Sequence, residues 1–351
     1  MDQGRMKNFS RRIFTDIAST MITGLAYVGS KNGLFKLMDG RGPMTVDDVV
    51  TASGLHPRYV EEWLKGMVCA EFLDYDPQAR TYTLPAEHAY FLNAEGTDHF
   101  MTGLYERAQS LLSVAPKVAE FFREGGGIRF SDYSDEFHSI SDKMNRGNYE
   151  LRLPTLWMEE MPDVRAKLTA GGRGLDFGCG VGRPPIALAK AFPKSHFVGV
   201  DSHTLSIETA QRLAKDEGVS DRVTFLNQRI DDFDSREKFD FISACDCVHD
   251  LEDPLGTLRK IHDLLAPAGT FFVIEPKVAD ELEENKSPIP TMFYGFSMFY
   301  CMTQSLAKGG PGLGTCYGTA NMKQLMREAG FSRFDVLNIR SPVNVFYAVR
   351  H

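Results

Sequence analysis

The sequence lacks the features that mark membrane and secreted proteins. It has no run of about 18 consecutive apolar residues, the length that a membrane-spanning helix requires. Its first twenty residues carry basic side chains but no apolar stretch before a small-residue cleavage site, so no signal peptide is indicated. We therefore expect a cytoplasmic protein that has no contact with a membrane.

Close cysteine pairs of the kind that hold zinc are also missing. The six cysteines are dispersed, and the one tight pair, Cys245 and Cys247, has C-x-C spacing rather than a C-x-x-C repeat. A hard cation needs clustered acidic ligands, but the short run of Asp231, Asp232 and Asp234 is typical of a solvated loop. We expect reduced cysteines and no metal centre.

An excess of positive charge is absent as well. The formal net charge is −8, whereas nucleic-acid binding needs a basic surface that neutralises phosphates. The 43% of apolar and 25% of charged residues are typical of soluble globular proteins. We therefore expect a folded protein without a nucleic-acid partner. Because 351 residues exceed the ~100–200 of one domain, we also expect at least two domains.

The first part of the chain has the pattern of a winged helix. Helical periodicity over residues 12–38 is followed by a helix-capping motif at Thr45–Asp48 and by a strongly amphipathic helix after Pro57. Residues 72–84 then read as a short hairpin with Asp76-Pro77 in its turn. We expect residues 1–95 to form a winged-helix domain.

A winged helix binds DNA in many proteins, and in others it is a packing or dimerisation module. The second helix here carries Glu61, Glu62 and Glu71 against only Arg58 and Lys65, and acidic side chains repel phosphate. The charges therefore favour a dimerisation module, so we expect a homodimer.

The rest of the chain divides into a helical and an α/β part. Residues 96–170 are largely helical in pattern and predict a connector that contributes helices to both halves and to an acceptor pocket. From residue 171 to 351, short β-branched or aromatic runs alternate with helices, which predicts a doubly wound parallel sheet. The last two strands, 334–339 and 344–349, are too close for a crossover helix and should be antiparallel.

A glycine-rich turn follows the first strand of the α/β part. Glycines at 178, 180 and 182 permit backbone angles, and a close approach of a ligand, that a Cβ would block. A dinucleotide-binding fingerprint requires a third glycine at the position that Arg183 occupies. The spacing G-x-G-x-G resembles the class I S-adenosylmethionine-dependent methyltransferases instead.

That resemblance implies a set of cofactor contacts. The loop backbone and Asp176 would hold the methionine portion, and Asp201, which ends the second strand, can accept hydrogen bonds from both ribose hydroxyls. The acid that meets the adenine is ambiguous, since one alignment selects Arg229 and the other, which we favour, selects Asp231 with Ile230 on the ring. The expected cofactor-binding residues are Asp176, Phe177, Gly178, Gly180, Asp201, Ser202, Ile230, Asp231, Cys245 and Asp246.

The segment His249-Asp250 resembles plant-type small-molecule O-methyltransferases, in which the histidine is the general base. A bacterial-type winged-helix methyltransferase subgroup with the same His-Asp-x-x-Asp-Pro run looks closer still. Histidine has a pKa near neutrality and suits proton removal from a hydroxyl. His249 is therefore the candidate catalytic residue, with a purely structural hydrogen bond as the alternative.

Two segments after the fifth strand suggest the acceptor. Residues 291–302 are apolar almost all round a helix, which is typical of buried core but also lies where a family of this kind keeps its acceptor pocket. The glycine-rich segment 308–318 suits a mobile lid or a tight irregular loop. An apolar or aromatic acceptor fits this lining.

The sequence thus predicts an enzyme that transfers a methyl group from S-adenosylmethionine to a small molecule, most plausibly to oxygen. Transfer to nitrogen, sulfur or carbon on the same scaffold remains an alternative, because pocket geometry selects the acceptor atom. A winged-helix regulator that only senses the cofactor is the non-catalytic alternative.

Overall fold

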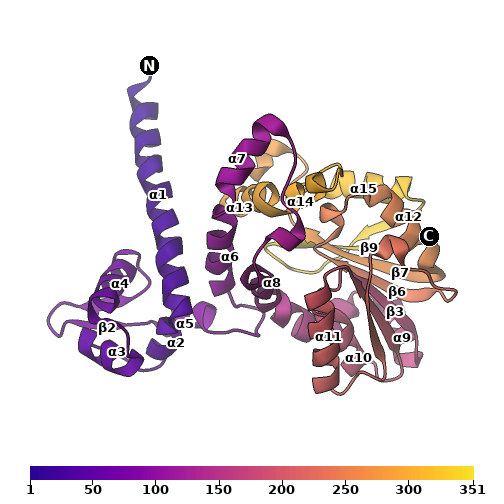
Figure 1. Ribbon diagram of the computed structural model, residues 1–351, viewed down its shortest axis with the longest axis horizontal. Helices are drawn as coiled ribbons and strands as arrows, with labels where there is room; N and C mark the ends of the chain where they lie inside the picture. The colour runs from indigo at the N-terminus through magenta and orange to yellow at the C-terminus, as the bar shows by residue number, and fades with distance from the viewer. The chain divides into compact units, whose positions relative to one another are not determined.

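The protein consists of two compact units in a computed structural model that describes residues 1–351 (Figure 1). The N-terminal unit comprises Met1–Ser113 and Glu136–Gly147, and the sheet unit comprises Val114–Asp135 and Asn148–His351. Residues of the expected connector, 96–170, belong to both units. None of the helices has both the length and the apolar character that a membrane span requires.

The N-terminal unit begins with a long helix, and the elements of a winged helix follow it along the chain. The helix-capping motif forms as expected, since the Thr45 hydroxyl accepts from the backbone N–H of Asp48 while the Asp48 carboxylate accepts from Thr45. The hairpin strands pair antiparallel. The elements are α1 (Gln3–Lys31), α2 (Leu34–Met38), α3 (Val46–Ser53), α4 (Pro57–Cys69), β1 (Asp74–Asp76), β2 (Thr81–Thr83), α5 (Ala86–Leu92), α6 (Thr102–Leu112) and most of α8 (Asp135–Gly147).

Helix α1 differs from the single helix expected over residues 12–38. It starts earlier, because the Asp2 side chain accepts from the backbone N–H of Arg5 and caps the first turn. It ends at Lys31, because Gly33 adopts a left-handed φ of 67° and separates α1 from α2. Its C-terminal half packs on α4, where the Trp63 indole donates to the Leu25 carbonyl at 2.9 Å.

The exposed face of α4 carries charges that pair with one another. Lys65 lies 2.5 Å from Glu61, and Arg58 forms an ion pair with Glu62. These pairs leave no surplus of positive charge for phosphate on the helix that a DNA-binding winged helix would use. The expected absence of a nucleic-acid partner stays a prediction.

The sheet unit contains a seven-stranded sheet with the strand order β5-β4-β3-β6-β7-β9-β8. The five strands from β5 to β7 are parallel, and β9 is antiparallel to both of its neighbours, which confirms the expected fold class and C-terminal hairpin. The strands are β3 (Arg173–Phe177), β4 (His196–Asp201), β5 (Val223–Asn227), β6 (Phe239–Cys245), β7 (Leu265–Pro276), β8 (Arg333–Val336) and β9 (Asn344–Arg350).

Helices cover both faces of the sheet, and each face has its own apolar core. Along β7, Phe271 and Val273 belong to one core and Phe272 and Ile274 to the other, as the two-residue period of a strand requires. The helical elements are α7 (Ala115–Glu124), η1 (Phe130–Asp132), η2 (Asn148–Trp157), α9 (Pro162–Ala170), α10 (Arg183–Ala191), α11 (Thr204–Asp216), η3 (Ile230–Asp232), η4 (Val248–Asp250), α12 (Pro254–Leu264), η5 (Leu282–Asn285), α13 (Pro288–Phe296), η6 (Ser297–Cys301), α14 (Met302–Ala307) and α15 (Thr319–Glu328).

Candidate active site at the carboxyl edge of the sheet

The glycine-rich turn links β3 to α10. Gly178, Gly180 and Gly182 all have positive φ, at 63°, 51° and 76°. A Cβ at Gly182 would lie 2.4 Å from the Phe225 ring, so this glycine serves packing against β5. A Cβ at Gly180 would meet nothing within 4 Å, so the turn presents bare backbone to open space there. A ligand can lie against the main chain at Gly180.

Asp176 lies just before this turn and is almost fully buried. Its Oδ1 accepts a hydrogen bond from the Ser243 hydroxyl at 2.6 Å, whereas its Oδ2 has no partner. Burial raises the pKa of Asp176 to about 7. The hydrogen bond from Ser243 lowers this pKa, and the nearby Asp201 carboxylate raises it further. A buried carboxylate oxygen without a partner is costly, and a cationic donor from a ligand would satisfy it.

Asp201 at the end of β4 ties two loops together. Its Oδ2 accepts from the backbone N–H of Gly180 at 2.9 Å, and its Oδ1 accepts from the backbone N–H of His203 at 2.8 Å. Ser202 lies between the acid and that second donor. Each carboxylate oxygen has a further lone pair, so the group can still accept from a ligand hydroxyl.

Arg229 and Asp231, the two candidates for the adenine contact, form an ion pair with one another at 2.8 Å. Asp231 also accepts from the Thr257 hydroxyl at 2.7 Å, which anchors it to α12. Ile230 between them is buried in the core below the sheet edge. Both alignments considered from the sequence therefore lead to the same place, and Asp231 is the better fixed of the two side chains.

The strand β6 ends at Cys245, and the next residue is strained. Asp246 has a φ of 53°, a value that non-glycine residues rarely adopt and that costs on the order of 1–3 kcal/mol. Its carboxylate accepts from the Asn344 amide at 3.1 Å and from the Tyr149 hydroxyl at 3.4 Å. Sequence reasoning missed Tyr149 and Asn344, since they lie about a hundred residues away along the chain on either side.

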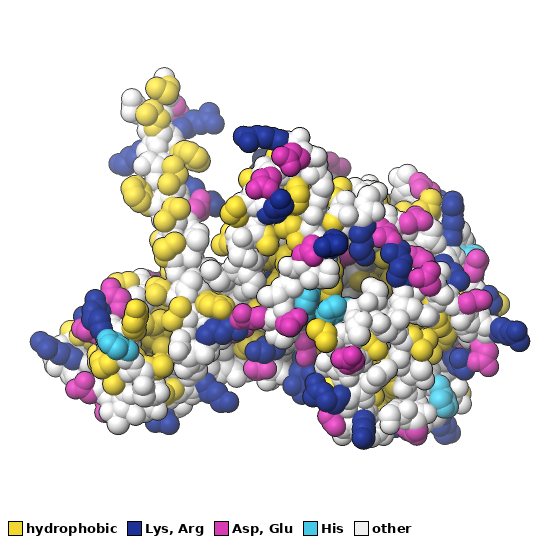
Figure 2. Space-filling model, viewed as in Figure 1, with side chains coloured by type: hydrophobic (Ala, Val, Ile, Leu, Met, Phe, Trp, Pro, Cys, Tyr) yellow, Lys and Arg dark blue, Asp and Glu magenta, His cyan; other side chains and the backbone are white.

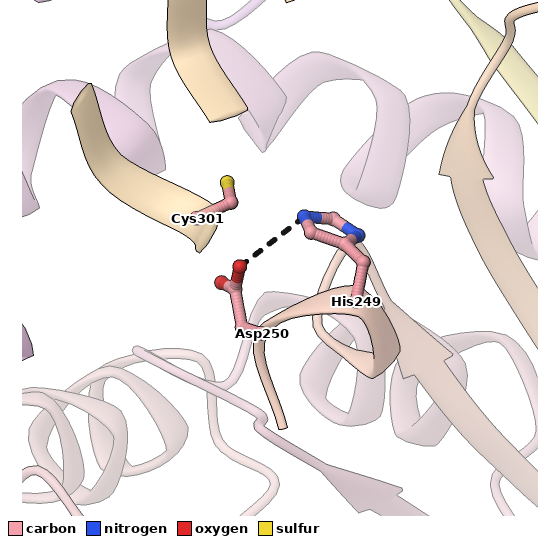
Figure 3. Close-up of side chains that lie close together, drawn as sticks. All are labelled: His249, Asp250 and Cys301. Atoms are coloured by element: carbon pink, nitrogen blue, oxygen red, sulfur yellow. Dashed lines mark ion pairs between the residues drawn. The ribbon is translucent and has the colours of Figure 1, made fainter. Parts of the chain in front are cut away.

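His249 in η4 is buried and held between two carboxylates. Its Nδ1 contacts Glu275 at the end of β7, and its Nε2 lies 3.4 Å from an Asp250 oxygen (Figure 3). Burial by itself lowers the pKa of His249, but the negative charges of Glu275 and Asp250 outweigh it and raise that pKa well above its ordinary value. With the Nδ1–H donated to Glu275, Nε2 is the nitrogen that can exchange a proton with a substrate.

Glu275 was missed by the sequence reasoning, although it ends a strand that was recognised. Its side chain is buried, and its Oε1 has no partner. An acid after the apolar run of β7 lies at the same sheet edge as His249, because the carboxyl ends of parallel strands meet there. An acidic residue at the end of this apolar strand was therefore the sequence signal that could have identified Glu275.

An aromatic cluster lies near this edge in the sheet unit. Phe130 of η1 packs edge-to-face on His203 at 5.1 Å between ring centroids, and it also contacts Tyr300. Tyr133 contacts Tyr300 at 5.1 Å and donates its hydroxyl to the Phe299 carbonyl. The segment around η1 thereby packs on the apolar insertion. There α13, the π-helical turn η6 and α14 follow one another without a break, so the expected helix over residues 291–302 is present.

The glycine-rich segment after α14 is held by hydrogen bonds. Gly310 and Gly312 donate to Ser305, at 2.9 and 3.1 Å, and Gly314 donates to the His249 carbonyl at 3.1 Å. A Cβ at Gly314 would lie 2.1 Å from the hydroxyl oxygen of Ser297. Of the two readings of this segment, the tight irregular loop describes it, and the loop buttresses the backbone that carries His249.

Comparison with known proteins gives two family matches. Residues 168–330 match the model of a methyltransferase domain, and residues 20–94 match the model of an Rv2258c-like winged HTH domain. Over 34% of this chain, the sequence is 30% identical to sterol 24-C-methyltransferase of Saccharomyces cerevisiae, of which 32% is covered. The chain spans about a third of the length of the first such curated relatives.

Two solved structures resemble the whole chain at low sequence identity. A candidate O-methyltransferase from Nostoc punctiforme has a TM-score of 0.75 at 17% identity, with 97% of this chain and 98% of that one covered. Human N-acetylserotonin methyltransferase, in complex with S-adenosylmethionine, has a TM-score of 0.66 at 16% identity, with 100% and 98% covered. These likenesses show the fold.

The matches confirm the family and the fold class expected from the sequence. Both family models fall on the parts of the chain where the sequence predicted them, the winged helix before the α/β domain. The site residues themselves stay predictions. Residues 168–330 of the chain are thus a methyltransferase domain, and residues 20–94 are an Rv2258c-like winged helix-turn-helix domain.

Proposed function

We propose that the protein is an S-adenosylmethionine-dependent methyltransferase that methylates an oxygen atom of a small, apolar or aromatic molecule. The observation that carries the proposal is the buried, unpartnered Oδ2 of Asp176 beside the bare backbone of Gly180. S-adenosylmethionine offers what these groups lack, namely an ammonium group for the carboxylate and a chain that can lie along the turn.

The residues at the sheet edge fit the other parts of the cofactor. The Asp201 carboxylate, at the end of β4, would accept from the ribose hydroxyls, and Asp231 with Ile230 would meet the adenine. Phe177, Gly178, Ser202, Cys245 and Asp246 complete the proposed contacts. When bound, S-adenosylmethionine supplies a methyl carbon on a sulfonium sulfur, which an acceptor atom can attack in line.

His249 is the proposed general base. From its neutral form, in which Nε2 carries no proton, the ring would take the proton of the acceptor hydroxyl as that oxygen attacks the methyl carbon. The raised pKa of His249 makes the ring a stronger base and shifts this activity toward higher pH. Glu275 fixes the ring through Nδ1, and Glu275 and Asp250 together stabilise the imidazolium that forms. A base in this position contributes roughly 10²–10⁴-fold to the rate, and a hydroxyl acceptor needs one more than a carbon acceptor does.

The acceptor class follows from the side chains around η6. Phe130, Tyr133 and Tyr300 form an aromatic cluster beside His203, which follows Asp201 by two residues. Rings in such a cluster favour an apolar or aromatic acceptor through edge-to-face contacts. The alternative of carbon methylation is supported by the similarity to a sterol 24-C-methyltransferase. Identifying the methylated atom separates the two.

A homodimer built on α1 belongs to the proposal. Large apolar side chains are exposed along one side of this helix (Figure 2), and helical spacing places most of them on one face. A twofold axis would let the same stripe of a second copy cover them. The stripe consists of Met6, Phe9, Ile13, Phe14, Ile17 and Met21.

The proposal also includes a reducing, cytoplasmic compartment, in which the six cysteines remain thiols.

The direct test is transfer of a labelled methyl group. The purified protein is incubated with methyl-labelled S-adenosylmethionine and a panel of hydroxylated aromatic compounds, and products are identified by mass spectrometry. We expect a product labelled on oxygen and a loss of roughly 10²–10⁴-fold in turnover for His249→Ala. The matched control is His196→Ala, an exposed histidine at the start of β4, which should retain turnover. Unchanged turnover in His249→Ala would sink the base assignment.

A further inference from the structure

We infer that His249, Asp250 and Cys301 form a binding site for a thiophilic divalent cation, with Zn²⁺ as the best match. One ligand atom from each residue lies within 4.8 Å of the other two. Asp250 and His249 come from η4 and Cys301 from η6, so two segments about fifty residues apart meet here (Figure 3). Local spacings in the sequence predict no metal centre, because Cys301 lies about fifty residues from His249 and Asp250.

The ligand set suits zinc better than a hard cation. Imidazole nitrogen, thiolate sulfur and carboxylate oxygen are the three donors that Zn²⁺ uses, whereas Mg²⁺ and Ca²⁺ take oxygen alone. In a tetrahedral zinc site the ligand atoms lie about 3.3–3.6 Å from one another. The distance from Nε2 of His249 to the Asp250 oxygen is 3.4 Å, so this pair already has the required separation.

The orientation of the histidine is a second and independent observation. Histidines that bind metals donate their other ring N–H to a carboxylate or carbonyl, which fixes the tautomer and makes the ligating nitrogen more basic. His249 contacts Glu275 through Nδ1, and this leaves Nε2 directed at Asp250 and the Cys301 thiol. Glu275 therefore takes the position that supports a metal-binding histidine.

The three proposed ligands are buried to different extents. His249 and Cys301 are almost fully buried, and so is the Asp250 oxygen that faces Nε2, while the Asp250 side chain as a whole is 22% exposed. Three protein ligands leave the fourth tetrahedral position for water. Binding releases protons to solvent, because the Cys301 thiol must become a thiolate and His249 must be neutral with Nε2 unprotonated.

Metal binding and proton abstraction by His249 exclude one another, because Nε2 has one lone pair. The site does not depend on methyl transfer for its existence, so the test reads the metal directly. Chelator-treated protein is titrated with CoCl₂, and the thiolate-to-cobalt charge-transfer absorption is followed. We expect one equivalent of Co²⁺ per chain with this absorption, and its stoichiometric displacement by ZnCl₂.

Cys301→Ser should abolish the charge-transfer absorption and weaken Zn²⁺ binding at least tenfold. Cys69→Ser removes an exposed thiol of the N-terminal unit and is the matched control, which should bind as the wild type does. Asp250→Asn keeps the thiol and should also weaken binding at least tenfold, which guards against a fold defect in the first variant. Absence of the band in the wild type, or its persistence in Cys301→Ser, overturns the site.

Discussion

Replacing Asp176 with asparagine should make the ligand-free protein more stable while weakening cofactor binding. The folded protein holds the pKa of Asp176 at about 7, chiefly because the group is buried, against an ordinary value of 3.8. A raised pKa favours the neutral acid in the folded state. The stability that the neutral form contributes is fully present below pH 3.8 and is lost as the pH rises toward 7.

The size of the effect follows from the two pKa values. The cost of the charge in the folded state is below about 1 kcal/mol at pH 4, about 2 at pH 5 and about 4 at pH 7, where it begins to level off. An asparagine has nearly the same shape, can accept from Ser243 through its oxygen, and carries no charge at any of these pH values. The stability gained by Asp176→Asn should therefore grow by about 3–4 kcal/mol between pH 4 and pH 7.

Urea unfolding followed by tryptophan fluorescence measures this difference. The chain has two tryptophans, and Trp157 is packed in the core of the sheet unit. A Trp63→Phe background in both proteins leaves Trp157 as the sole reporter of that unit. A stability difference that stays constant between pH 4 and pH 7.5, or a variant less stable at pH 7.5, would refute the assignment of a buried charge.

The same variant should lose affinity for S-adenosylhomocysteine, because the ammonium group of the ligand loses a charged partner. A hydrogen bond to a charged group is worth ~1.5–3 kcal/mol, so we expect roughly a tenfold to hundredfold weaker Kd. Both effects have the same cause: the buried carboxylate of Asp176 destabilises the ligand-free protein and binds the ammonium group of the ligand. Equal affinity in the two proteins would contradict this.

Other predictions concern the base, the loop, the dimer and the metal. Glu275→Gln should lower kcat at least tenfold with an unchanged Kd for S-adenosylhomocysteine, measured by labelled-methyl transfer and calorimetry; equal kcat refutes its positioning role. Gly314→Ala should cost ~1–3 kcal/mol more, by thermal unfolding, than Gly309→Ala, which has a similar φ but open space. Ile13→Asp should give a monomer in light scattering, and Asn8→Asp on the opposite face should not; a wild-type monomer contradicts the stripe. Zn²⁺ should inhibit methyl transfer, and a chelator should restore it. Turnover that Zn²⁺ does not change would contradict the use of His249 both as zinc ligand and as base.

Much of the fold could be read from local pattern. The capping motif at Thr45, the hairpin turn and the short link before β9 each follow from neighbouring residues, and the structure has all three. The break at Gly33 was missed, since a glycine within a helical pattern is tolerated as often as it ends a helix. The run of apolar residues in β7 belongs to a strand buried on both faces, since alternate residues enter the two apolar cores.

The candidate site could be read only where it follows strand ends. Asp176, Asp201 and His249 stand directly after or near predicted strands, so their common edge followed from parallel topology. Tyr149 and Cys301 act through contacts with residues far away in the sequence, and one sequence contains no record of such contacts. The choice between Arg229 and Asp231 depended on a loop of uncertain register, and the structure places both in one ion pair.

The central claim, that this sheet edge holds S-adenosylmethionine, is tested most directly by calorimetric titration with S-adenosylhomocysteine. We predict one molecule per chain with a Kd in the micromolar range, about −8 kcal/mol. Asp201→Asn should weaken binding clearly, and Asp221→Asn, an exposed acid in the loop before β5, should leave it unchanged. Wild-type protein that binds neither S-adenosylhomocysteine nor S-adenosylmethionine would contradict the account.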